Sequence, residues 1–155
     1  MEIFDENNLE SEMNIHTEGV QVYDTNIYRY ELTPYQILDE IVKLKWLQHD
    51  NIVLDVGSGK GRVAFYLNNE IGCRVIGVEI IEELYNESVM NLERFKAQNP
   101  SQDILFIKSN ILDAKVLVGE KWDVLYCFNS IPSEQIKMLF TGMCVDAVSD
   151  ESFVR

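Results

Sequence analysis

The stretch from Leu54 to Arg62, LDVGSGKGR, carries three glycines on alternate positions directly after a short apolar run. Glycine loses more backbone entropy on folding than other residues, so three in five positions indicate a conformation or a close approach that a Cβ would block. A glycine loop between a strand and a helix presents backbone N–H groups and the positive helix end to a ligand. Gly57, Gly59 and Gly61 therefore form a candidate ligand-binding loop.

The spacing of these glycines distinguishes between two classes of ligand. The dinucleotide fingerprint G-x-G-x-x-G/A would place a third small residue at position 62, where this chain has Arg62. The glycines fit G-x-G-x-G instead. Glu79 ends the next predicted strand, where one carboxylate can accept hydrogen bonds from both hydroxyls of a ribose. We expect an adenosine-type ligand; the alternative is that the glycines and the acid are only turn residues.

Four continuous apolar runs predict the strands that position this loop. They are NIVLDVG, CRVIGVEI, DILFIKSN and WDVLYCFN, and such runs are typical of strands buried on both faces of a parallel sheet. Helical spacing predicts a helix from the glycine loop to Gly72, another over 84–95, and a third after Ser133 as its N-cap. Strands alternating with helices predict an α/β fold with a doubly wound parallel sheet.

A further helix is predicted before the first strand, within LTPYQILDEIVKLKWL. Thr33, Pro34 and Gln36 fit a capping box with proline at the first helical position. Apolar residues then continue at helical spacing to Leu44, and the stem of Lys45 can cover apolar surface. Before this helix, residues 1–26 carry seven acidic residues and no Lys or Arg. We interpret 1–26 as a mobile acidic arm and 27–155 as the ligand-binding domain.

Composition narrows the partners and the compartment. The chain has 26 acidic and 13 basic residues and a formal charge of −13, which makes nucleic acid an improbable partner because nucleic-acid affinity comes mainly from Lys and Arg. It contains neither a signal peptide nor the ~20 apolar residues of a membrane span, so we expect a cytoplasmic protein without a membrane partner. The three cysteines lie far apart in the sequence, which favours buried thiols over disulfides. With only two histidines besides, we expect no metal site.

At LDVGSGKGR and VIGVEI the sequence resembles motifs I and II of the class I S-adenosylmethionine-dependent methyltransferases. The resemblance runs from about Tyr28 to Phe140. More narrowly, YELTPYQILDEI, DVGSGKGRV, GCRVIGVEI and CFNSIPS resemble a bacterial group of unassigned substrate, and more distantly the non-SET histone-lysine methyltransferases. It implies a Rossmann-like fold, S-adenosyl-L-methionine as cofactor, and methyl transfer to a small molecule or a protein side chain.

The resemblance also implies roles for individual residues at the cofactor. Gly57 and Gly59 would pass against its methionine part, with Asp55 near the amino group. Glu79 would hold the ribose hydroxyls, and Ile80 would lie against the adenine.

The resemblance implies further residues on the next two strands. Asn110 matches the position of an acid that holds the adenine amino group, and Asp113 is the competing residue. Asn129 falls where the family's motif IV faces the transferred methyl, although FNSIPS replaces the family's FNPF.

Five residues near the first helix and the glycine loop have two interpretations each. Three tyrosines, Tyr28, Tyr30 and Tyr35, could line the pocket or pack in the core. Two basic residues, Lys60 and Arg62, could steer a carboxylate or lie in solvent.

Two alternatives remain open beside a methyltransferase: a module that binds the cofactor without catalysis, and a nicotinamide dehydrogenase domain. A complete class I sheet has seven strands, whereas SEQIKMLFTGMCVDAV reads as a helix after the fourth strand. We therefore expect a core that is incomplete on its C-terminal side, either shortened or completed by a homodimer through the open edge. The alternative is that GMCVDAV forms a fifth strand.

Overall fold

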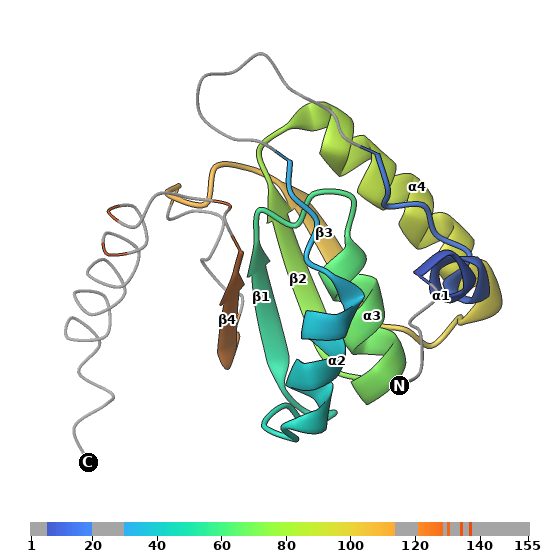
Figure 1. The fold of residues 1–155 in the computed structure, drawn as a ribbon. Helices are drawn as coiled ribbons and strands as arrows, with labels where there is room; N and C mark the ends of the chain where they lie inside the picture. The colour runs from blue at the N-terminus through green and yellow to red at the C-terminus, as the bar shows by residue number, and fades with distance from the viewer. Residues whose placement is uncertain are drawn as a thin grey trace.

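The computed structural model describes residues 6–19, 30–113, 121–128, 130, 134 and 137. Helices and strands alternate through most of this part (Figure 1). Their order is α1 (Glu6–Met13), α2 (Tyr35–Lys43), β1 (Ile52–Val56), α3 (Arg62–Ile71), β2 (Arg74–Glu79), α4 (Glu82–Gln98), β3 (Ile104–Lys108) and β4 (Val124–Cys127). The four predicted strands are confirmed, and so are the two helices that follow β1 and β2. The helix predicted after Ser133 lies outside the described residues.

The four strands form a parallel sheet in the order β3-β2-β1-β4. Because the chain extends from β1 in one direction to β2 and β3 and in the other to β4, the strand order reverses at β1. Open α/β sheets bind ligands at such a reversal, outside the carboxyl ends of the strands. The topology therefore places the glycine loop, which follows β1, at the expected binding edge.

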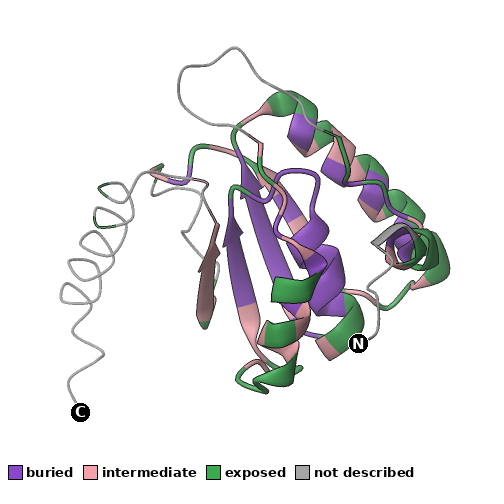
Figure 2. Ribbon diagram, viewed as in Figure 1, coloured by how far each residue is buried: buried purple, intermediate pink, exposed green. Residues whose placement is uncertain are grey.

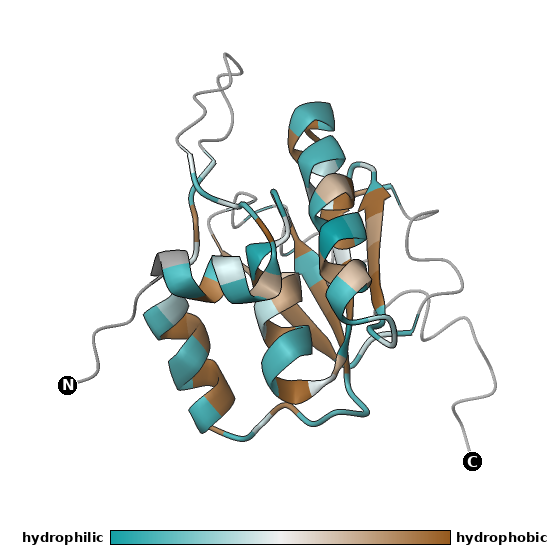
Figure 3. Cartoon of the chain, turned by 90° about the vertical axis from the view of Figure 1, so that its right-hand side faces the viewer, coloured by the Kyte–Doolittle hydropathy of each residue, from teal (hydrophilic) through white to brown (hydrophobic). Residues whose placement is uncertain are grey.

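The sheet separates two apolar clusters, as alternation along a strand requires. Val53 and Val75 point to one face, where α1 to α4 pack, and Leu54 and Ile76 point to the other. Figure 2 shows the mostly buried strands β1 and β2 in the middle of the fold, beside the helices. In Figure 3 the helical layer faces the viewer, with hydrophilic residues on its outer side and largely hydrophobic strands behind it. Burial on both faces explains the continuous apolar runs of the sequence.

The predicted first helix is shorter than expected at both ends. Pro34 is its N-cap residue and makes no side-chain cap hydrogen bond, so the capping box is wrong. The Thr33 hydroxyl lies 3.0 Å from the hydroxyl of Tyr126 instead. At the other end the helix stops at Lys43, and Lys45 takes a left-handed φ of 55°. The predicted continuation through Lys45 is therefore wrong as well.

The acidic N-terminal segment is part of the fold where the structure describes it. Residues 6–13 form α1, and Met13 and Ile15 are 3% and 0% exposed within the core cluster that lies under the helices. The expectation of a mobile arm is therefore corrected for residues 6–19, because its few apolar residues are buried. The predicted boundary at 26/27 lies outside the described residues.

The described cysteines carry free thiols. Cys73 is fully buried, and burial raises the pKa of its thiol to about 11. Cys127 is half-buried, and Cys144 lies outside the described residues. Cys73 thus confirms the prediction of a buried thiol. Within the described ranges, the structure has no helix that is both long and apolar enough for a membrane span.

Candidate ligand-binding site at the glycine loop

The glycine loop folds tightly onto the carboxyl end of β2. The backbone N–H groups of Gly57 and Ser58 both donate to the carbonyl oxygen of Val78, at 2.9 and 3.1 Å. Gly57 and Gly59 have left-handed φ values of 75° and 54°. A Cβ on Gly57 would lie 2.2 Å from Ser130 Cβ, and one on Gly59 would lie 2.4 Å from the Tyr30 ring. The chain's own side chains therefore already require these glycines.

Glu79 closes the loop from the end of β2. Its carboxylate is 5% exposed, and its two oxygens accept hydrogen bonds from the backbone N–H groups of Gly59 and Ile81, both at 2.8 Å. Burial raises the pKa of this carboxyl, while the backbone donors oppose the rise. A carboxylate has about four lone-pair positions, so these two hydrogen bonds do not use up its capacity to accept. The structure thus joins Glu79 to the loop by hydrogen bonds, and its role toward a ribose stays a prediction.

Asp55 lies in β1 just before the loop and is 2% exposed. Its Oδ2 atom and the Oγ atom of Ser58 are buried and find no hydrogen-bond partner among the described residues. Burial first, and the charge of Glu79 second, raise the pKa of Asp55 from 3.8 to about 7. A buried polar atom without a partner costs free energy. The two atoms therefore mark a place where a ligand with hydrogen-bond donors would be stabilised.

Asp55 and Ser58 both line an open pocket of about 330 Å³, a volume that includes open solvent. One wall is the segment 30–33, which the sequence suggested only through Tyr30. Next to Thr33 of this wall lies Tyr126 from β4. Tyr126, Thr33 and Ser58 were not among the predicted site residues. The alternation of β4 could have indicated Tyr126, because it shares a face of the strand with Val124. The remaining lining residues are Gly57, Arg62, Val63 and Phe128.

Other predicted residues lie at the same edge of the sheet but outside this pocket. Ile80 follows β2 and is 55% exposed, and its contact with an adenine stays a prediction. Asn110 follows β3, and its side-chain oxygen accepts from the backbone N–H of Leu112 at 3.0 Å. Its competitor Asp113 is exposed on the same loop. Asn129 lies outside the described residues, so its predicted role stays a prediction.

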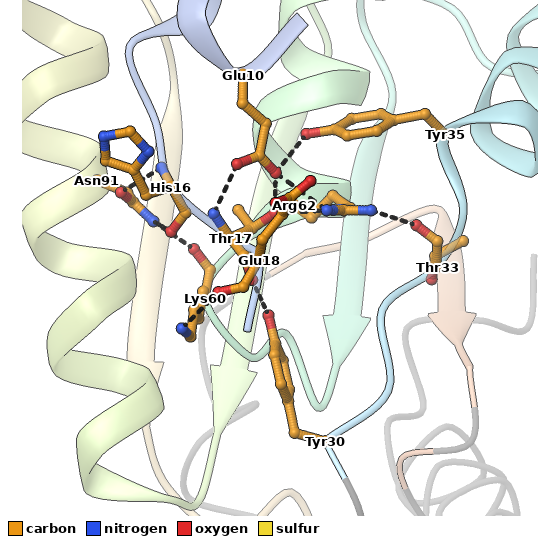
Figure 4. Close-up of polar contacts among 10 residues, drawn as sticks. All are labelled: Glu10, His16, Thr17, Glu18, Tyr30, Thr33, Tyr35, Lys60, Arg62 and Asn91. Atoms are coloured by element: carbon orange, nitrogen blue, oxygen red, sulfur yellow. Dashed lines mark hydrogen bonds and ion pairs between the residues drawn. The ribbon is translucent and has the colours of Figure 1, made fainter. Parts of the chain in front are cut away.

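The remaining aromatic and basic candidates have structural partners. Tyr35 is fully buried in the core, whereas Tyr30 lines the pocket, and Tyr28 lies outside the described residues. Lys60 and Arg62 are almost fully buried and bind the N-terminal segment, as Figure 4 shows. Neither basic side chain therefore lies in solvent.

We expect Gly59→Ala to destabilise the protein more than Gly72→Ala does. Gly72 also has a left-handed φ, 78°, but a Cβ there would have no atom within 4 Å, so only the backbone cost of about 1 kcal/mol applies. At Gly59 the Tyr30 ring must move as well, which brings the cost to at least about 2 kcal/mol. Urea unfolding of both variants measures the difference. If both variants lost the same free energy of unfolding, the close packing of Tyr30 on the loop would be contradicted.

Comparison with known proteins gives a family and several similar chains. Residues 53–144 match the family described as a methyltransferase domain. Two curated proteins of Dictyostelium discoideum are similar in part. One is a histone-lysine N-methyltransferase specific for H3 lysine-79, 38% identical over 63 residues, or 41% of this chain and 3% of that protein. The other is named "Probable protein-L-isoaspartate O-methyltransferase" and is 34% identical over 89 residues, 56% of this chain and 27% of that protein.

Solved structures share the fold. An RNA methyltransferase from Salinibacter ruber, in complex with S-adenosyl-L-homocysteine, has a TM-score of 0.57 at 24% identity, over 72% of this chain and 70% of that chain. Magnesium protoporphyrin IX methyltransferase from Synechocystis, with bound SAM, has a TM-score of 0.54 at 18% identity, over 72% and 51% of the two chains. The Rossmann-like parallel sheet expected from the sequence is thereby confirmed. The chain spans 3% and 27% of the length of the two curated relatives.

Proposed function

Because this chain belongs to the methyltransferase domain family, we propose that it binds S-adenosyl-L-methionine at the glycine loop and transfers a methyl group to an acceptor. The observation that carries the proposal is the pair of buried carboxyl groups at the ends of β1 and β2, Asp55 and Glu79, on either side of that loop. One lacks a partner for Oδ2 among the described residues, and the other keeps free acceptor positions.

These residues suit the two polar parts of the cofactor. Asp55 would accept from the amino group, which an ionised carboxylate binds by a charge-assisted hydrogen bond. Glu79 would accept from the ribose hydroxyls through the lone pairs that Gly59 and Ile81 leave free. Ile80 offers an exposed apolar side chain to the adenine, and the amide oxygen of Asn110 can accept from its amino group.

When bound, the cofactor would supply an electrophilic methyl group on a positively charged sulfur. The protein's part in such a reaction is to align the nucleophile within ~3–3.5 Å of the methyl and to exclude water, so a dedicated general base is optional. In this proposal Asn129 faces the methyl, and the segment 30–33 shields the pocket from water. The role of Asn129 rests on the family resemblance, and that of the segment 30–33 rests on the pocket lining.

We expect S-adenosylmethionine and S-adenosylhomocysteine, but not NAD, to raise the melting temperature. A ligand at a hundredfold excess over its dissociation constant stabilises the native state by about 2.7 kcal/mol, or about 5–10 °C for a domain of this size. NAD should fail because Arg62 occupies the position of its third small residue. A thermal-shift titration provides the test. A response to NAD alone would instead support the dehydrogenase alternative.

Turnover distinguishes an enzyme from a module that only binds the cofactor. We propose a protein side chain as the first acceptor to test, because both curated relatives carry names of protein methyltransferases. A cell extract incubated with the protein and methyl-labelled donor would be separated into protein and small-molecule fractions. Label in either fraction identifies the acceptor class, whereas binding without any label would favour the non-catalytic module.

Two finer expectations complete the proposal: a cytoplasmic protein, and a homodimer formed through β4. Within the described residues β4 pairs only with β1, on one side. Residues 142–148, the alternative partner strand, lie outside them. Sedimentation velocity over a range of concentrations tests self-association.

A further inference from the structure

Glu10 and Arg62 form an ion pair in the interior of the protein. Arg62 Nη2 lies 3.1 Å from Glu10 Oε1, and both side chains are almost fully buried. Thr17 completes the contact, since its hydroxyl accepts from Arg62 Nε at 2.8 Å and donates to Glu10. The Thr17 backbone N–H donates to the second carboxylate oxygen at 2.9 Å. This cluster fastens residues 10–18, which we name the N-terminal strap, onto the start of α3 (Figure 4).

The same cluster holds one wall of the pocket. Arg62 Nη1 donates to the carbonyl oxygen of Thr33 at 3.5 Å. The Tyr30 hydroxyl donates to the carbonyl oxygen of Thr17 at 2.9 Å, which fixes the ring that covers Gly59. Tyr30 and Thr33 are the two ends of the wall segment 30–33, and no residue of the strap lines the pocket. The strap therefore reaches the pocket only through other residues.

Hydrogen bonds to α4 hold the far end of the strap. The Asn91 side chain accepts from the backbone N–H of His16 at 3.0 Å and donates to the His16 carbonyl oxygen at 2.9 Å. It also donates to the carbonyl oxygen of Lys60 at 3.1 Å. The Lys60 ammonium in turn donates to the carbonyl oxygen of Glu18 at 3.0 Å. Each basic residue of the loop motif thus binds the strap.

From these contacts we infer that Glu10 is a positioning residue for the cofactor pocket, acting through Arg62 and Thr17 on the wall 30–33. The inference rests on the proposed function, because it takes the pocket as the cofactor site. A buried ion pair contributes little to stability compared with apolar side chains of similar volume, whereas its directional hydrogen bonds can fix a geometry. In this chain they fix where Thr33 and Tyr30 stand.

If packing of the strap on the fold strengthens ligand binding in the pocket, then ligand binding must strengthen the packing of the strap by the same free energy. We expect S-adenosylhomocysteine to slow hydrogen exchange at the amides of His16 and Thr17, which lie outside the pocket. The amides of Leu44 and Asn51, in the turns between α2 and β1, serve as the reference for any general stabilisation. Slower exchange confined to the strap supports the inference, and equal slowing at both places overturns it. This measurement needs no variant.

The double variant Glu10→Leu/Arg62→Met tests the same point by replacing the charges with apolar side chains. We expect a folded protein whose affinity for S-adenosylhomocysteine falls about tenfold, because the wall must then be ordered on binding. Lys43→Met, which removes a cation from an exposed ion pair on α2, is the control and should bind as the wild type does. Calorimetry measures affinity, and thermal unfolding checks the fold.

The results distinguish failure of the positioning role of Glu10 from failure of the proposed cofactor binding. If the folded double variant binds as tightly as the wild type, the positioning role is wrong and the proposed function stands. If the double variant does not fold, the exchange measurement on the wild type decides. If the wild type itself binds no S-adenosylhomocysteine, the proposed function fails and the inference fails with it.

Discussion

Glu79→Ala is expected to lower the affinity for S-adenosylmethionine by about 100-fold, which corresponds to the loss of a charged acceptor for two hydroxyls. The structure adds a second effect, because Glu79 also accepts from the backbone N–H groups of Gly59 and Ile81. Without that acceptor the loop should lose about 1–3 kcal/mol of stability. We therefore expect Glu79→Ala to lower both the affinity for the cofactor and the free energy of unfolding. Calorimetry and urea unfolding give the two numbers.

Glu82→Ala provides the matched control for this variant. Glu82 stands three residues further on, at the start of α4, where it pairs at 2.8 Å with Lys108 on the surface. Its removal changes the net charge by the same amount but leaves the loop untouched. Affinity and stability should both stay near the wild-type values. An unchanged affinity in folded Glu79→Ala protein would show that the ribose role is wrong.

Asp55→Asn is expected to stabilise the ligand-free protein above pH 7 while weakening cofactor binding. Burial and the charge of Glu79 raise the pKa of Asp55 from 3.8 to about 7 in the folded state. Between about pH 4 and pH 7 the folded state therefore binds more protons than the unfolded state, so stability falls as pH rises through this window. At about 1.4 kcal/mol per pKa unit, a few kcal/mol are lost by pH 8.

An asparagine at position 55 does not titrate, so the variant should match the wild type near pH 4 and exceed it by about 2 kcal/mol or more at pH 8. The lost charge should weaken binding about 10- to 100-fold. Urea unfolding at several pH values and calorimetry at pH 8 measure both effects. Asp103→Asn, on the surface, is the control. Parallel stability curves for Asp55→Asn and the wild type would contradict the pKa shift.

The sheet could be predicted from the sequence because each strand is a short, continuous apolar run bounded by polar residues or glycine. A strand that is buried on both faces needs apolar residues at every position, so its pattern can be recognised from the local sequence alone. The start of α2 could not be predicted in the same way. Thr33 looked like a cap by local spacing, but its hydroxyl bonds to Tyr126, 93 residues away. A tertiary contact thus overrode a local rule.

The candidate site likewise contains residues that the local sequence predicts and residues that only tertiary packing brings together. Glu79 could be predicted because it ends a strand at the binding edge of the sheet, and Asp55 because it matches a position of the family motif. The partner of Arg62 could not, since Glu10 is one of seven acidic residues in a segment without an evident period. Nothing in the local sequence distinguishes Glu10, which is buried, from Glu12 and Glu18, which are exposed. Only the packing of α1 and Ile15 against the core brings Glu10 to the start of α3.

The N-terminal strap also has a consequence for the order of events during synthesis. It is synthesised before α3 and α4, yet Glu10 bonds to a residue 52 positions later, and His16 to one 75 positions later. The strap cannot dock until α4 has been made, and contacts of such long sequence separation form slowly because loop closure must precede them. Its acidic residues favour hydration of this segment before it docks, since the first 26 residues contain no Lys or Arg. The strap is thus made before its binding partners and reaches its native place only after α4 has formed.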